Sequence, residues 1–172
     1  MTAEQLRPGA RIATVHEAGH AVVAVHLGVP VERVQLSSYW IDPFSIFNQS
    51  DLSGGGVSYL PSENGQLTEH AIISAASRVA VDTLIRPGAH PETAYSDDED
   101  CLKEISNELG VTDFQDWRSG ILERAREIVS IGFIRAAILR IADELQAAPL
   151  EDGLIGEHVR EVLRDAATRG NA

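Results

Sequence analysis

Two histidines and a glutamate lie close together near the start of the chain, in the order His16, Glu17 and His20. On an α-helix, residues four apart share one face about one turn apart, so both imidazoles can reach a single metal ion. The glutamate directly after the first histidine then flanks the open coordination position of that ion. This pattern predicts zinc chemistry in which Glu17 acts as a general base on a hydrolytic water.

The residues around this motif favour a metal over a chance match. They are apolar on both sides, so a helix here would be buried on several sides. Without a metal, each partly buried and unsatisfied polar group would cost about 1–3 kcal/mol. We therefore expect a buried helix over residues 13–27, with Thr14 as its N-cap and Gly28 directly after its end.

A catalytic zinc ion needs three protein ligands, so one more has to come from elsewhere in the chain. His26 follows His20 at the spacing of the metzincin motif, but Val23 replaces the glycine that turns the chain in that motif. In a continuing helix His26 points to another face, which makes it the weaker candidate. The acidic cluster 97–100 is better placed, at a helix start, although capping alone would explain some of its acids.

Four parts of the chain, in this order, resemble the peptidase domain of FtsH-type ATP-dependent zinc metalloproteases. Residues 16–21 have the family's usual form of the histidine motif, and residues 31–36 with 56–61 look like its two strands. Residues 75–82 are similar to its small-residue helix, and residues 96–98 resemble the acidic step that carries its third zinc ligand. The resemblance covers most of the chain, and the first part is the highly specific one.

The resemblance implies a ligand set for one Zn²⁺ ion and a general base. His16 and His20 would be the imidazole ligands, and Asp98 would be the carboxylate ligand. Glu17 would be the general base. Helical phase favours Asp98 over Asp97, because the apolar positions counted from residue 98 match the family's inward face. Asp82 would accept a hydrogen bond from the N–H of a ligand histidine.

The resemblance also implies how a substrate would bind. In the family the substrate pairs as an added strand beside the site, which implies Val57, Ser58 and Tyr59 as substrate-binding residues. Main-chain hydrogen bonds of this kind would give broad tolerance for loosely folded proteins or peptides. The family's ATPase module has no counterpart in this sequence. We therefore expect a separate ATPase or other partner protein, or a homo-oligomer.

The elements that must position these residues follow from hydrophobic periodicity and turn signals. Two strands are predicted at 31–36 and 57–60, and helices at 67–84, 98–109, 117–148 with a bend or break near Ser130, and 155–167. This is a mainly α fold with a small β-sheet (α+β) and a helical C-terminal half, and the resemblance implies a zincin-like FtsH peptidase-domain architecture. One domain spans residues 1–172, with residues 1–12 and 168–172 expected to be flexible.

Composition argues against several other classes of protein. The formal net charge of −12 disfavours nucleic acid, which is bound through clustered Lys and Arg. The longest apolar run, residues 21–25, is far shorter than the roughly 20 residues that span a bilayer. The single cysteine, Cys101, cannot form an internal disulfide, and no signal-peptide pattern precedes the motif. We expect a cytoplasmic protein without direct membrane insertion.

Two other functions stay open at this level. Residues 39–53 carry Trp40, Phe44 and Phe47 without a clear period, which is typical of lids and partner-binding loops. A metallopeptidase-like binding or regulatory module could use this segment to contact a partner. The intact Glu17 favours an enzyme, because a binding module has no need of a base. A site-specific peptidase that cleaves one regulator is the third interpretation.

Overall fold

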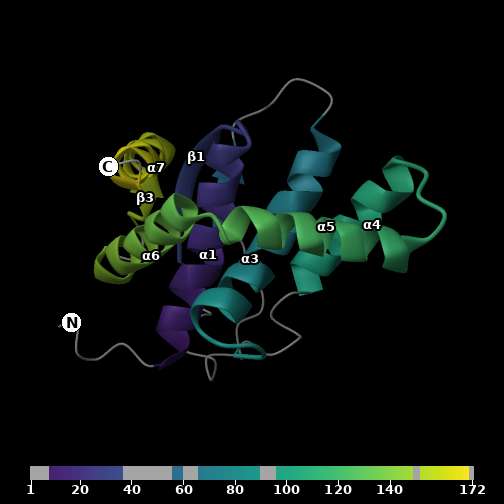
Figure 1. Ribbon diagram of the computed structural model, residues 1–172, viewed down its shortest axis with the longest axis horizontal. Coiled ribbons are helices and arrows are strands. Elements are labelled where there is room, and N and C mark those ends of the chain that lie inside the picture. Colours follow the sequence, from purple (N-terminus) through teal and green to yellow (C-terminus); the bar gives the residue numbers. More distant parts are fainter. Residues whose placement is uncertain (1–7, 37–55, 60–65, 90–95, 149–151, 171–172) are drawn as a thin grey trace.

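The computed structural model describes residues 8–36, 56–59, 66–89, 96–148 and 152–170 (Figure 1). In chain order the elements are α1 (Pro8–His26), β1 (Val31–Gln35), β2 (Gly56–Tyr59), α3 (Leu67–Leu84), α4 (Ser96–Glu108), α5 (Phe114–Val129), α6 (Gly132–Ala147), β3 (Leu154–Ile155) and α7 (Gly156–Gly170). The described chain is therefore mainly helical with a small antiparallel sheet, as predicted. The aromatic segment 39–53 lies outside the described residues. None of the helices described is both long and apolar enough to cross a membrane.

Helix α1 runs through the middle of the molecule, with α3, α6 and α7 packed around it (Figure 1). Every side chain from residue 13 to residue 24 is buried, because the sequence there is apolar or small on nearly all faces. The helix begins at Pro8, a residue suited to a first turn, which is earlier than predicted. Thr14 is therefore not an N-cap. Its hydroxyl donates within the helix, to the Arg11 carbonyl at 2.9 Å.

Helix α3 has the predicted bounds and lies very close to α1. A Cβ atom at Gly19 would lie 2.9 Å from the Cβ atom of Ala80 and 3.1 Å from the carbonyl oxygen of Ala76. These distances are shorter than ordinary contacts, so the close approach depends on the missing side chain at Gly19. The glycine inside the histidine motif thus brings α3 against the helix that carries both imidazoles.

The bend or break predicted near Ser130 is a break between two helices. Helix α5 ends at Val129, and α6 begins at Gly132 after Ile131, whose backbone is extended with φ −64° and ψ 128°. The amphipathic stripe continues on both sides of the break, so α5 packs on α3 while α6 packs on α1. One long periodic segment therefore forms two helices, which pack against α3 and α1.

The sheet is three-stranded, in the order β2-β1-β3, and both pairings are antiparallel. Strand β3 was not predicted from sequence, because two residues carry no readable pattern. It is held by close backbone approach: Cβ atoms at Gly153 and Gly156 would collide with the carbonyl oxygens of Val34 and Val31, respectively. The sheet therefore links the start of α7 to the strand that follows α1.

The ends of the described chain are helical where flexibility was expected. Residues 8–12 belong to α1, and residues 168–170 belong to α7. The first turns of α1 are also tied to α6, because Arg11 Nη1 donates to Asp143 Oδ1 at 2.6 Å. Residues 1–7 and 171–172, which the same prediction covered, lie outside the described residues.

Candidate metal centre

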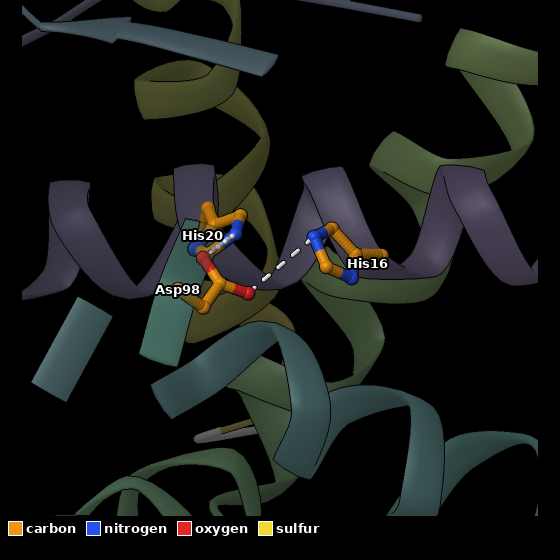
Figure 2. Close-up of side chains that lie close together, drawn as sticks. All are labelled: His16, His20 and Asp98. Atoms are coloured by element: carbon orange, nitrogen blue, oxygen red, sulfur yellow. Dashed lines mark ion pairs between the residues drawn. The ribbon is translucent and has the colours of Figure 1, made fainter. Parts of the chain in front are cut away.

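His16 and His20 lie on one face of α1, as their spacing predicts. Both are buried, with 5% and 8% of their surface exposed, and their ring centroids are 4.9 Å apart at an interplanar angle of 81°. Figure 2 shows both imidazoles on the side of α1 that faces Asp98. Two nitrogen donors are thus held together by helix geometry, inside the protein core.

Asp98, in the first turn of α4, completes the cluster (Figure 2). Its Oδ2 lies 3.6 Å from His16 Nε2, and its Oδ1 lies 3.2 Å from His20 Nε2. One donor atom from each of the three side chains lies within 4.8 Å of the others. The neighbouring Asp97 is exposed and lies 3.4 Å from the hydroxyl of Ser96. The structure therefore brings Asp98, and not Asp97, to the two histidines.

His26, the alternative third ligand, lies at the end of α1, away from this cluster. Its side chain is exposed, and its ring contacts that of Phe133 with centroids 6.1 Å apart. Val23 keeps the helix continuous up to this point, as expected from the missing glycine. The spacing from His20 to His26 therefore does not create a metzincin-type site.

The carboxylate of Asp98 is oriented by a residue that sequence reasoning did not single out. Ser77, on α3, is fully buried, and its hydroxyl donates to Asp98 Oδ2 at 2.7 Å. The apolar face of α4, through Leu102 and Ile105, holds this helix against its neighbours. Leu109 was expected on that face, but it lies beyond the end of α4 and is 43% exposed.

The orientation of His20 is set by the backbone of α3. Its Nδ1 atom lies 2.8 Å from the carbonyl oxygen of Ile73, so Nδ1 carries the proton and donates. Nε2 is then the atom that faces Asp98 and remains for a cation. Asp82, predicted as the acceptor for a ligand histidine, instead accepts the N–H of Gly88 at 3.0 Å. That prediction is wrong for His20, because a main-chain carbonyl takes the place of a carboxylate.

The electrostatics of the cluster favour a positive charge. Burial lowers the pKa of His20, but the charge and hydrogen bond of Asp98 outweigh burial and raise that pKa to about 9. For Asp98, burial alone would raise the pKa, but the charges of His20 and His16 and the hydrogen bonds from His20 and Ser77 outweigh burial and hold that pKa below its usual value. An ionised carboxylate facing two imidazoles therefore makes a place where a cation is stabilised, whether a proton or a metal.

Glu17 lies beside the cluster in a different environment. It is 3% exposed, and among the described residues its Oε2 atom has no hydrogen-bond partner. Desolvation raises the pKa of this carboxyl to about 7, opposed by the charge of His20 and assisted by that of Asp98. A carboxyl with a pKa near neutrality can both accept and return a proton at physiological pH.

The predicted substrate-binding residues Val57, Ser58 and Tyr59 form most of β2. This strand is at the end of the sheet order, and it pairs with β1 on one side, with Val57 opposite Val34 and Tyr59 opposite Val31. Within the described residues no strand pairs with its other edge. Strand β2 also contacts α1, the helix that carries the histidines. It therefore offers main-chain donors and acceptors near the helix of the site.

The donor set fits zinc. Tetrahedral zinc at about 2.0–2.1 Å from nitrogen and oxygen ligands places neighbouring donors about 3.3 Å apart. Asp98 Oδ1 lies 3.2 Å from His20 Nε2 and Asp98 Oδ2 lies 3.6 Å from His16 Nε2, so each carboxylate oxygen is at about this separation from one imidazole. Two imidazoles and one carboxylate are also the number of protein ligands that leaves a position for water in a catalytic site.

Comparison with known proteins found no family model that matches this chain, and no curated protein matches it in sequence.

Proposed function

We propose that this protein is a zinc-dependent metalloendopeptidase with an active site of the FtsH peptidase type. The observation that carries the proposal is the meeting of His16 and His20 with Asp98, contributed by helices about 80 residues apart, within 4.8 Å of one another. Buried Glu17 lies beside this cluster and interacts electrostatically with His20 and Asp98. A purely structural site would not require this carboxyl, whereas hydrolysis requires a base.

In this proposal each side chain has a separate task. His16, His20 and Asp98 hold the metal, and Ser77 and the Ile73 carbonyl orient two of these ligands. When bound, zinc supplies a Lewis acid that polarises the scissile carbonyl and makes water more acidic. Glu17 takes the proton from the attacking water and returns it to the leaving amine.

The proposed substrates are loosely folded proteins or peptides that pair with β2. Among the described residues one edge of β2 is unpaired, and main-chain hydrogen bonds to an extended chain at this edge would give broad sequence tolerance. The zincin-like FtsH architecture, a cytoplasmic location, and a separate ATPase, another partner or a homo-oligomer remain part of this proposal. Two alternatives stay open: a partner-binding module, which would use residues 39–53 outside the described residues, and a site-specific peptidase for a single regulator.

Bound zinc and cleavage of unfolded casein, measured on the same preparations, test this function. Wild type is expected to hold about one zinc per chain and to cleave casein. Glu17→Gln should keep the metal and lose roughly 100-fold or more of the rate, the usual contribution of a general base. Glu104→Gln, the same change at an exposed position on α4, should behave as wild type. If wild type binds zinc but does not cleave casein, the proposal of a general peptidase is contradicted.

A further inference from the structure

The residue after Asp98 makes a set of contacts that the proposed chemistry does not use. Glu99 receives the guanidinium of Arg118 on α5, with Arg118 Nε 2.8 Å from Oε2 and 3.1 Å from Oε1. A further bond joins Arg118 Nη2 to Oε1. Arg78, on α3, reaches the same carboxylate, with its Nη1 atom 3.5 Å from Oε1. One carboxylate thus joins three helices at the first turn of α4.

This cluster of Glu99, Arg118 and Arg78 differs from the exposed ion pair of α4. Its three side chains are 21–24% exposed, so they are largely shielded from water. The Asp100–Lys103 pair, on the same helix, is local, and its side chains are 67% and 57% exposed. Exposed pairs add little, whereas a shielded forked pair with arginine fixes geometry as well as adding energy.

The first turn of α4 needs such a restraint. The helix is acidic, and its buried residues, Leu102, Ile105 and Ser106, begin only one turn after Asp98. The first turn therefore carries none of the buried side chains of α4. The side chain of Ser77 orients the Asp98 carboxylate, but it does not hold the backbone that carries it.

We propose that Glu99 and Arg118 are positioning residues for the metal centre. Their bond fixes the first turn of α4 against α5, so that Asp98 faces the two histidines before a metal arrives. This inference rests on the proposed function, since it assumes that Asp98 is a metal ligand. It adds residues that touch neither the metal nor a substrate, and its consequence is a higher affinity for zinc.

For removal of the Arg118 side chain, a purely electrostatic role and a positioning role predict opposite changes in Zn²⁺ affinity. Removing the positive charge of Arg118 would strengthen the binding of a cation through the long-range field, whereas loss of positioning would weaken it. We expect Glu99→Gln and Arg118→Gln each to lower Zn²⁺ affinity roughly 10- to 100-fold, which is the usual effect of substituting a residue that orients a metal ligand. The double variant should be no weaker than the weaker single variant, because both remove one interaction.

The experiment is a Zn²⁺ competition titration of the full chain against a chromophoric chelator, with the Co²⁺ absorption spectrum as a measure of ligand geometry. Asp100→Asn is the matched control, because it removes the same charge from the same helix turn, and it should change affinity less than about twofold. Thermal unfolding in excess chelator measures stability separately. A positioning role requires a loss of affinity and a changed Co²⁺ spectrum beyond any loss of stability.

Arg118→Lys keeps the charge and loses the fork, so it carries the test if Glu99→Gln does not fold, and it should also weaken zinc binding. Tighter or unchanged zinc binding in Arg118→Gln would overturn the inference, as would independent, multiplicative losses in the double variant. If wild type binds zinc and all these variants bind it with the same affinity as wild type, this inference alone is overturned. A wild type that binds no zinc overturns the proposed function together with it.

Discussion

The two helices that meet at the candidate metal centre are built in opposite ways. Helix α1 is buried along residues 13–24, which include His16 and His20, and α3, α6 and α7 pack around it. Helix α4 is acidic and mostly exposed, and its ligand Asp98 lies in the first turn, where polar contacts from Ser77 and around Glu99 hold it. Helix geometry fixes the histidine pair, whereas contacts between helices fix the carboxylate.

This difference has a physical consequence. Packing in the core tolerates little displacement, so the imidazoles of α1 keep their places as long as the protein is folded. A partly exposed first turn depends on individual hydrogen bonds and ion pairs, each of modest net strength. The α4 side of the site is therefore expected to be the more easily weakened, without unfolding of the protein.

The largest effect should come from removing the carboxylate itself. Asp98→Ala is expected to reduce Zn²⁺ affinity by roughly 100-fold or more, because the total binding energy of a zinc site, about 10–16 kcal/mol in zinc fingers, is shared among few ligands. Asp97→Ala, one residue away and exposed, should leave affinity within about twofold. A chelator-competition titration of both variants measures this. Equal losses in the two variants would contradict the assignment of Asp98.

The next largest effect should come from the α1 side, and on stability. Gly19→Ala places a Cβ atom 2.9 Å from that of Ala80, so we expect the free energy of unfolding to fall by about 1–3 kcal/mol. Gly120→Ala is the control, because a Cβ there, inside α5, meets nothing within 4 Å. That change should be neutral or stabilising by up to about 1 kcal/mol. Urea unfolding with zinc removed compares them. Equal stabilities would refute the close packing at Gly19.

A smaller effect is expected from the hydroxyl that orients the carboxylate. Ser77→Ala removes the 2.7 Å hydrogen bond to Asp98 and should weaken zinc binding about tenfold. Ser74→Ala, one turn earlier on α3, removes a hydroxyl that donates to Cys101 Sγ instead. It should leave zinc affinity nearly unchanged in the same titration. A larger loss in Ser74→Ala than in Ser77→Ala would show that Ser77 does not orient the ligand.

What the sequence predicted follows the same division between local and tertiary contacts. The histidine pair, the bounds of α3 and the break near Ser130 depend on spacing along one helix, and the structure shows all three. The choice of Asp98 needed a family resemblance, because the family supplies the inward face against which the helical phase is counted. Helical phase points to Asp98, and the structure places its carboxylate at the histidines.

Contacts across the fold were not predictable from the pattern. The Ile73 carbonyl, which takes the role expected of Asp82, is a backbone atom with no sequence signal. Ser77 lies among small residues that indicate close helix packing, which was the only available hint of its place. Strand β3 depends on glycines whose neighbours come from a strand more than 100 residues earlier. Each of these features arises from tertiary contact alone.

We propose that His16, His20 and Asp98 hold one zinc ion. X-ray absorption at the zinc edge, on protein equilibrated with one molar equivalent of Zn²⁺, tests it most directly. We predict two imidazole nitrogens and oxygen donors at about 2.0–2.2 Å, without sulfur. Failure to retain zinc, or a sulfur ligand at about 2.3 Å from the sole cysteine, Cys101, would contradict the claim.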